Sequence, residues 1–195
     1  PRLRVAIDSA KSQNMPNDNI ERAIKRGTGE LEGVTYDEIT YEAYGPGGVA
    51  ILIEVLTDSR NRSAAEVRHI LSKGGGSLGS RNSVAYLFAR EGQLTVDGAA
   101  FTEEQVMEAG LEAGLSDVYE DEGLLVLSSA PEDLYGVKDA LEAAGIKVDS
   151  AEVVKAPSNT VCLSGHEAEQ TIRLLNALEE NEDVQAVYSN FEQVD

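Results

Sequence analysis

Residues 93–156 carry a strand and helix pattern that constrains the fold more than any other part of the chain. Short alternating apolar segments and two amphipathic stretches follow one another as strand, helix, strand, strand, helix, strand. We predict these six elements at residues 93–96, 102–113, 117–120, 124–128, 131–144 and 147–154. This βαββαβ order is that of a ferredoxin-like domain, whose four strands form one sheet.

Further strands are predicted on both sides of residues 93–156. They find no partner within that segment, because its four strands already form one sheet. Before it, "EITYEAY", the turn "GPGG" and the continuously apolar "VAILIEVL" predict a hairpin with a buried second strand, then a helix and a strand "VAYLF". After it, "VCLS", "EAEQTIRLLNALEEN" and "VQAVYSNF" predict strand, helix and strand. We therefore expect residues 93–156 to be inserted into a discontinuous α+β domain built from residues 36–91 and 157–195.

Residues 1–30 predict a small helical domain. Leu3, Ile7 and their neighbours recur at helical spacing, Pro16 interrupts, and Asp18 is the expected N-cap of a second helix that Gly27 ends. Helices this short are marginal without a packing partner, and the chain does not begin with Met, so we expect residues upstream of it. The predicted fold class is α+β: a short N-terminal helical domain followed by two α+β domains.

Charge is distributed unevenly along the 195 residues, whose formal net charge is -19. Residues 1–90 hold 12 Lys or Arg against 11 Asp or Glu, whereas residues 91–195 hold 4 against 24. Such asymmetry is typical of a protein in which one half meets a polyanion. The alternatives are that the acidic half serves solubility alone or docks basic protein surfaces.

Several classes of chemistry find no support in the sequence. His69 and His166 are far apart, and the single cysteine allows no Cys-x-x-Cys, so we expect no metal. Cys162 lies in an apolar strand, where we expect a buried side chain rather than a nucleophile served by His166. Neither "GPGG" nor "GGGSLGS" has the context of a nucleotide loop. We expect no enzyme and no cofactor.

Apolar runs are also too short to span a bilayer, which needs roughly 20 residues. No signal-peptide core begins the chain. We therefore expect a cytoplasmic protein with no membrane partner, and a monomer by default.

The stretch "TDSRNRSAAEVRHILSKGGGSLGSR" concentrates positive charge. Ser63 with Glu66 reads as a capping box, which predicts a helix over residues 64–73. Arg60 and Arg62 would then lie on an extended segment ahead of the helix, pointing to one side and beside its free N–H groups. This arrangement predicts a seat for phosphate. The alternative is that they pair with Asp58, Glu54 or an acid of the second half.

Other cations extend this expectation. Arg68 should lie at the edge of the buried face of the same helix with a free head, whereas a lysine in the last turn simply complements the helix dipole. The predicted nucleic-acid-binding residues are Arg60, Arg62, Arg68, Arg22, Lys25 and Arg26.

Three long segments carry a resemblance. The chain is similar to the YebC/PmpR family of transcriptional regulatory proteins, which includes mitochondrial translational activators, in "PRLRVAIDSAKSQNMPNDNIERAIKRGTGE", "ITYEAYGPGGVAILIEVLTDSRNRSAAEVRHILSKGGGSLG" and "SVAYLF". The resemblance implies three domains, one inserted in another, and no enzymatic activity. Members usually open with a basic segment that lies upstream of the first residue here.

The resemblance also implies a role in gene expression. The leading hypothesis is a non-enzymatic, DNA-binding regulator of transcription. The alternative is a translation factor that acts on the ribosome or on messenger RNA, because phosphate contacts alone do not distinguish DNA from RNA. Two further hypotheses are a small-molecule sensor in residues 93–156 and a protein-interaction scaffold that uses the acidic half.

Overall fold

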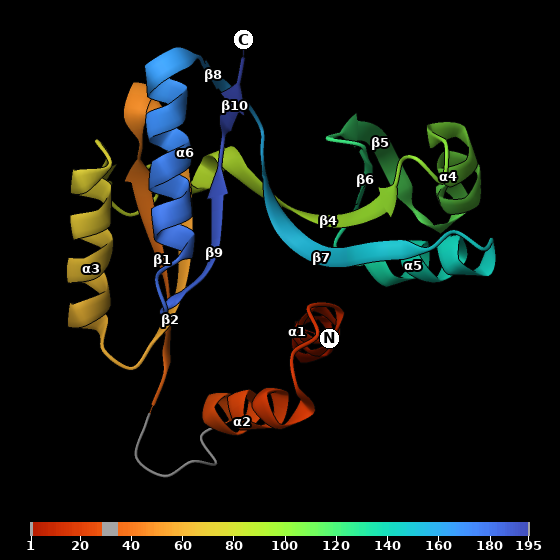
Figure 1. The fold of residues 1–195 in the computed structure, drawn as a ribbon, viewed down its shortest axis with the longest axis horizontal. Helices are drawn as coiled ribbons and strands as arrows, with labels where there is room; N and C mark the ends of the chain where they lie inside the picture. Colours follow the sequence, from red (N-terminus) through yellow and green to blue (C-terminus); the bar gives the residue numbers. More distant parts are fainter. Residues whose placement is uncertain (1, 29–34, 195) are drawn as a thin grey trace. The chain divides into compact units, whose positions relative to one another are not determined.

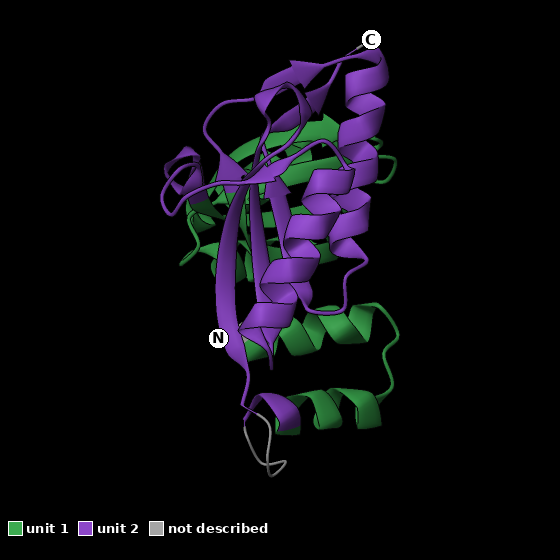
Figure 2. Cartoon of the chain, turned by 90° about the vertical axis from the view of Figure 1, so that its left-hand side faces the viewer, with its two compact units in different colours: residues 1–25, 90–155 green, residues 26–89, 156–195 purple. Residues whose placement is uncertain are grey.

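The computed structural model of the protein describes residues 2–28 and 35–194. These residues form two compact units (Figure 2). One unit combines residues 1–25 with residues 90–155, and the other combines residues 26–89 with residues 156–195. Each unit is therefore built from segments that are distant in the sequence. Residues 29 and 30, the end of the predicted helical domain, lie outside the described residues.

Two short helices begin the chain, α1 (Arg2–Ser12) and α2 (Asn17–Gly27). The carbonyl oxygen of Pro16 accepts the backbone N–H groups of Asn19 and Ile20, at 2.9 and 3.2 Å. Helix α2 therefore begins at Asn17, and Asp18 lies in its first turn instead of capping it as predicted. Gly27 ends the helix as expected.

A four-stranded sheet forms the centre of the unit of residues 26–89 and 156–195. Its strands are β1 (Asp37–Tyr44), β2 (Ala50–Thr57), β3 (Ser77–Leu78) and β9 (Val184–Ser189), in the order β3-β1-β2-β9. The predicted hairpin is confirmed, because β1 pairs antiparallel with β2 through the turn η1 (Pro46–Gly48), in which Gly47 has a φ of 63°. Strand β9 pairs with β2, so the segments before and after residues 93–156 share one sheet, as expected.

Two helices cover one face of this sheet (Figure 1): α3 (Arg60–Lys73) and α6 (Gly165–Glu179). Their apolar side chains pack on those of β1 and β2 in one cluster, which includes Ile51, Ile53, Val67, Leu71, Leu174 and Leu178. A parallel pair, β8 (Val161–Leu163) and β10 (Phe191–Gln193), completes the unit. The alternate residues of β2 face the other side, where Ala50 and Leu52 form a second cluster with Val84.

The segment over that second face differs from the prediction. "VAYLF" contains a short 3-10 turn, η2 (Ala85–Leu87), and only its last residue begins a strand, β4 (Phe88–Asp97). The backbone N–H groups of Asn82, Val84 and Ala85 donate to the carboxylate of Glu42, at 2.5, 2.8 and 2.9 Å. Because these donors are taken by a side chain, no strand ladder forms here.

The sheet of the other unit has the order β5-β6-β4-β7. It consists of β4, β5 (Leu115–Asp121), β6 (Leu124–Ser129) and β7 (Val148–Pro157). Helix α4 (Glu103–Gly110) with its extension η3 (Leu111–Ala113) precedes β5, and helix α5 (Leu134–Ala143) precedes β7. The chain order strand, helix, strand, strand, helix, strand is the one expected from the sequence. Thr102 caps α4 through a capping box with Gln105.

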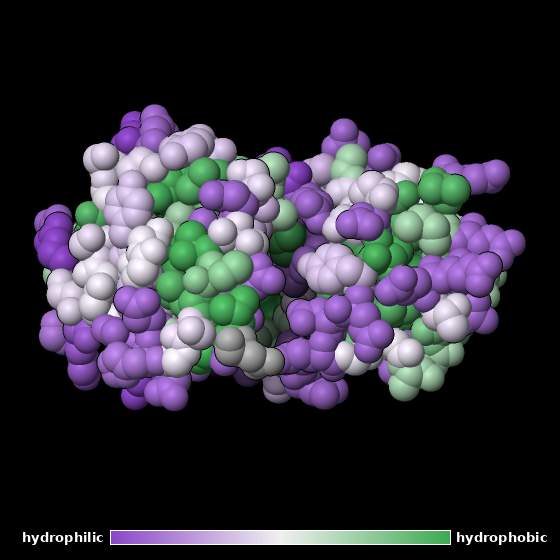
Figure 3. All heavy atoms as spheres, turned by 90° about the horizontal axis from the view of Figure 1, so that it is seen from above, coloured by the Kyte–Doolittle hydropathy of each residue, from purple (hydrophilic) through white to green (hydrophobic). Residues whose placement is uncertain are grey.

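Alternation along these strands separates two faces. Leu94, Val118 and Leu125 contribute to the core beneath the helices. Tyr119 alternates with Val118 and stands opposite Val126, so it lies on the face that the helices do not cover. Seen from above, hydrophilic residues cover most of the visible surface, and apolar residues form separate patches (Figure 3). No helix of the described residues is long and apolar enough to cross a membrane.

Candidate nucleic-acid interface

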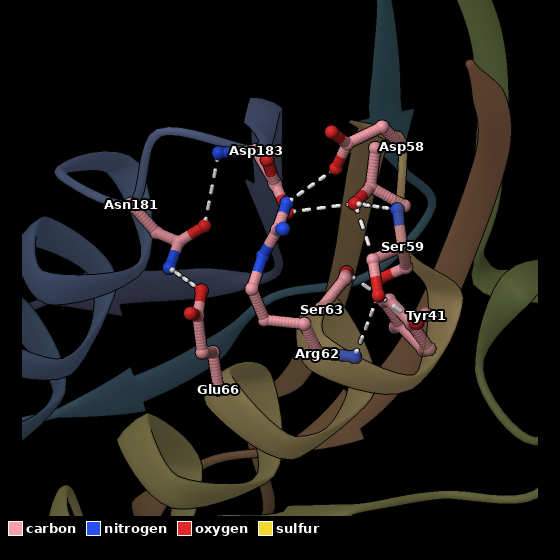
Figure 4. A network of polar contacts seen from close by, with 9 residues as sticks. Tyr41, Asp58, Ser59, Arg62, Ser63, Glu66, Asn181 and Asp183 are labelled. Carbon is pink, nitrogen blue, oxygen red and sulfur yellow. Dashed lines mark hydrogen bonds and ion pairs between the residues drawn. The ribbon is translucent and has the colours of Figure 1, made fainter. Parts of the chain in front are cut away.

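Helix α3 begins four residues earlier than the sequence predicts. Ser59 is the N-cap, with extended backbone, and its hydroxyl accepts the backbone N–H of Arg62. Ser63 is completely buried, and its hydroxyl lies 3.5 Å from that of Tyr41 (Figure 4). The predicted capping box at Ser63 and Glu66 is therefore wrong. Both serines fit the cap pattern, and the packing of Ser63 beneath the helix decides between them.

This start places the first two arginines inside the helix. Residues two apart on a helix point about 200° away from each other. Arg60 and Arg62 accordingly reach different partners, and the predicted geometry of two arginines on an extended segment facing one side is wrong.

Arg60 forms a two-point ion pair with Asp37 of β1. Its Nε lies 2.8 Å from Oδ2, and its Nη2 lies 2.9 Å from Oδ1. The hydrogen bond from Arg60 lowers the pKa of Asp37 below its ordinary value, and the pKa of Arg60 is raised in turn. Both side chains are well exposed, so solvent and salt screen the pair.

Arg62 belongs to a network that joins α3 to the loop after α6 (Figure 4). Its Nη2 lies 2.7 Å from Oδ1 of Asp58 and 3.3 Å from Oδ2 of Asp183. Asp183 also accepts a hydrogen bond from Thr57, at 2.8 Å. The hydrogen bond that Arg62 donates to Asp58, followed by the one it donates to Asp183, raises the pKa of Arg62. For Arg62 the structure therefore matches the alternative expectation, in which the arginine pairs with Asp58 and with an acid of the second half.

Charge at the start of α3 is therefore balanced locally. Three carboxylates, of Asp37, Asp58 and Asp183, face the two guanidinium groups. They also compensate the positive end of the helix dipole. A phosphate that binds here has to exchange with a carboxylate.

Arg68 is placed differently, on the exposed surface further along the helix. Within residues 2–28 and 35–194 it makes no hydrogen bond or ion pair, and the same holds for Lys73. The one acid of α3, Glu66, accepts a hydrogen bond from Asn181 at 3.0 Å.

The cations of α2 are all exposed: Arg22, Lys25 and Arg26. Asp18 and Glu21 of the same helix are exposed as well. Most of helix α2 belongs to one compact unit and helix α3 to the other.

The loop of residues 79–86, hereafter the tyrosine loop, was not predicted as a functional feature. It is organised around Glu42, which is 8% exposed. Burial raises the pKa of the Glu42 carboxyl, but the backbone N–H groups of Val84, Ala85, Asn82 and Ser83 together outweigh burial, so the pKa lies below its ordinary value. Beyond this anchor, Tyr86 extends into solvent with 75% of its surface exposed. The sequence did contain a signal for this anchor, because Glu42 stands opposite Leu52 in the continuously apolar part of β2.

The thiol and imidazole groups form no site. Cys162 is exposed and its Sγ lies 3.7 Å from the carboxylate of Glu192, so the prediction of a buried cysteine is wrong. Strand alternation turns Leu163 inward and Cys162 outward. His166 is exposed too. Among the described residues, no group of three or more His, Cys, Asp or Glu side chains is arranged to hold a metal ion.

Comparisons with known proteins cover nearly the whole chain. The family described as "TACO1/YebC second and third domain" matches residues 36–191, and "TACO1/YebC protein N-terminal domain" matches residues 1–30. A "probable transcriptional regulatory protein" of Acidithiobacillus ferrooxidans is 55% identical over 191 residues, which are 98% of this chain and 76% of the relative. A protein of the same description from Desulfatibacillum aliphaticivorans is 53% identical over 97% of this chain and 77% of its own length.

A solved structure is similar along the full length. The crystal structure of the conserved hypothetical protein Aq1575 from Aquifex aeolicus superposes with a TM-score of 0.89 at 46% identity. The match covers 100% of this chain and 81% of that one. The α+β fold class, with N-terminal helices and two four-stranded sheets, is confirmed by this likeness.

Proposed function

The chain belongs to the TACO1/YebC family, and we propose that it is a non-enzymatic, nucleic-acid-binding regulator of gene expression. The names of its relatives, probable transcriptional regulatory proteins, support the regulatory role and the absence of catalysis. On the same ground we propose DNA as the partner and transcription as the process.

The observation that carries the proposal is the exposed positive surface of α3. Arg68 and Lys73 have no opposite charge bound to them within the described residues, although the chain as a whole carries -19. In so acidic a chain, most of the surface repels phosphate. Cations that stay uncompensated supply the sequence-independent part of nucleic-acid affinity. We therefore place Arg68 first among the contacts.

Arg60 and Arg62 are proposed as conditional contacts. A phosphate that displaces Asp37 keeps the two-point geometry of Arg60, because carboxylate and phosphate fit the guanidinium fork alike. Arg62 is held by two carboxylates and is the harder of the two to release. Arg22, Lys25 and Arg26 of α2 are proposed as further contacts on a separate helix.

The division into domains is proposed as follows. Residues 1–30 form a helical domain, residues 36–91 with 157–195 form a discontinuous α+β domain, and residues 93–156 are inserted in it. The two matched family descriptions, of an N-terminal domain and of a second and third domain, support this division. Strands β4 and β7 are then the two crossings between the discontinuous domain and the insertion.

A salt titration of binding tests the proposed function. We would measure the affinity of the full chain for duplex DNA, and for RNA of the same sequence, between low and moderate salt. Arg68→Glu should weaken binding and reduce the slope of log K against log salt by about 1, the value for one phosphate contact. Arg173→Glu is the matched control, because Arg173 of α6 is also exposed but already lies 3.5 Å from Glu169.

The outcomes separate the alternatives. Loss of affinity in Arg68→Glu but not in Arg173→Glu, at unchanged melting temperature, supports the proposal. Preference for RNA over DNA of equal length would move the proposal from transcription to translation. Absence of binding to either nucleic acid by the unaltered chain at low salt would contradict it.

A further inference from the structure

Tyr86 is the most exposed of the large apolar and aromatic side chains in the described part of the protein, at 75% of its surface. Single exposed aromatic side chains are common on protein surfaces and need no explanation by themselves. Tyr86 differs because the backbone that carries it is fixed on both sides. A ring held in water by a fixed backbone is prepared for a partner at little further entropic cost.

Apolar packing fixes the residues next to the ring. Val84 is completely buried against Ala50 and Leu52, and Ala85, Leu87 and Phe88 pack around the same cluster. The carbonyl oxygen of Leu87 accepts the backbone N–H of Ser158 at 2.7 Å. The turn η2 is therefore held on both sides of Tyr86. Val84 packs on the sheet before the ring, and after it Leu87 is hydrogen-bonded to Ser158, the residue that follows β7.

Polar contacts fix the preceding residues. The carboxylate of Glu42 accepts three backbone N–H groups of the tyrosine loop, and the hydroxyl of Tyr44 donates to the carbonyl oxygen of Ser83 at 3.3 Å. Glu42 is buried and its charge is satisfied by these donors, so it presents no carboxylate to a ligand at the surface.

The sequence of the loop itself carries positive charge. Residues 79–90, "GSRNSVAYLFAR", contain two arginines and no acid. Arg81 and Arg90 are exposed, and within the described residues neither makes a hydrogen bond or ion pair. Tyr119 offers the contrast in the same chain, because it is 46% exposed and stands beside Asp121, Glu91 and Asp117. The arginines next to Tyr86 in the sequence can attract phosphate, whereas the carboxylates beside Tyr119 repel it.

We propose that the tyrosine loop binds single-stranded nucleic acid, with one unpaired base stacked on Tyr86 and the neighbouring phosphate on Arg81. A base can reach an exposed ring face only when it is outside a duplex stack, which selects single strands, loops or bulges. This inference rests on the proposed function and names the class of ligand. It adds a site on the sheet face opposite α3.

The test compares Tyr86→Ala with Tyr119→Ala in the full chain. The probe is a labelled twelve-nucleotide single strand, set beside the duplex of the same sequence, and the readout is fluorescence anisotropy. Tyr86→Ala should weaken single-strand binding about 5- to 150-fold, the range that base stacking on an aromatic ring supports, and leave duplex affinity unchanged. Tyr119→Ala and Tyr86→Phe should leave both affinities unchanged. Both tyrosines are exposed, so equal melting temperatures are expected.

Intrinsic fluorescence gives an independent readout. The chain has seven tyrosines and no tryptophan, so its emission comes from tyrosine alone. Stacking should quench part of this emission when the single strand is added, and Tyr86→Ala should abolish that part. The inference would be overturned if Tyr86→Ala and the unaltered chain bound the single strand with equal affinity. The same result is expected if the ring contacts a protein instead of a base. Binding to duplex alone overturns the inference and leaves the proposed function standing, whereas binding to neither form overturns the proposed function.

Discussion

The tyrosine loop and the uncovered face of the second sheet both present an aromatic ring to solvent, but they differ in whether the nearby carboxylates are buried or exposed. At the loop, Glu42 is buried and its charge is consumed by backbone N–H groups. On the sheet face, the carboxylates stay in solvent around Tyr119, whose pKa is raised by burial and then by Asp121, Glu91 and Asp117.

This difference shows why net charge is a poor guide to partners here. The net charge of -19 describes only the average electrostatic field of the chain. An acidic side chain that is hydrogen-bonded inside the fold can hold a surface loop in place without repelling an anion from that surface. The position of a carboxylate relative to backbone donors decides its effect.

Glu42→Gln should break the arrangement at the loop. The amide leaves some backbone N–H groups of the tyrosine loop without an acceptor, and each buried unsatisfied donor costs about 1–3 kcal/mol, so we expect the free energy of unfolding to fall by about 3 kcal/mol. Urea unfolding at pH 7 measures this, with Glu38→Gln, exposed on the same strand, as the control. A change equal to the control would contradict the anchoring role.

The same pair of proteins tests the pH dependence. The folded-state pKa of Glu42 is lowered, so its contribution to stability is present above the ordinary pKa of a glutamate and is lost as the pH falls through the folded-state pKa. The gap in unfolding free energy between the unaltered chain and Glu42→Gln should therefore narrow in acid. A gap that stays constant from pH 7 to pH 3 would mean that the charge of Glu42 is irrelevant.

Asp183→Asn tests the network at the start of α3. Asp183 accepts a hydrogen bond from the fully buried Thr57 and lies 3.3 Å from Arg62, and its side chain is only 17% exposed. We expect unfolding free energy to fall by about 1–2 kcal/mol. Glu182→Gln, exposed and adjacent, should have no effect. Unchanged stability of Asp183→Asn would reduce the network to surface pairing and strengthen Arg62 as a phosphate contact.

Reversing the charge around Tyr119 should make the second aromatic surface resemble the first. In a chain with Asp117→Lys and Asp121→Lys, we expect affinity for the single strand to rise by roughly one order of magnitude at low salt. The pKa of Tyr119 should also fall, because two of the carboxylates that raise it are gone. Anisotropy and ultraviolet titration measure the two effects. A lowered pKa without gained affinity would show that charge alone does not make a base platform.

Sequence reasoning identified those parts of the fold in which periodicity and burial agree. Strands β1 and β2 and the six elements from β4 to β7 followed from the periodicity of apolar residues. The start of α3 did not, because Ser59 and Ser63 both fit an N-cap, and only tertiary packing buries Ser63. "VAYLF" has strand composition, but the backbone N–H groups of Val84 and Ala85 donate to Glu42, 42 and 43 residues upstream.

The candidate site was predictable in part for the same reason. The residue types around α3 indicated either phosphate contacts or ion pairs, and nothing local distinguishes the two. Asp37 is 23 residues from Arg60, and Asp183 is 121 residues from Arg62, so both pairs are products of the assembled sheet. The exposure of Tyr86 likewise depends on which neighbours the sheet buries.

The smallest expected effect concerns Arg60. Asp37→Asn removes the charge that holds the guanidinium group while leaving the arginine in place at the start of α3. Since both side chains are exposed, stability should not change measurably. If Arg60 contacts phosphate, its release from Asp37 should raise duplex affinity by about two- to threefold at low salt, with a steeper salt dependence. Asp37→Asn combined with Arg60→Gln is the control and should show no gain. Equal affinity in Asp37→Asn and the unaltered chain would assign Arg60 to the fold alone and leave Arg68 as the contact on α3.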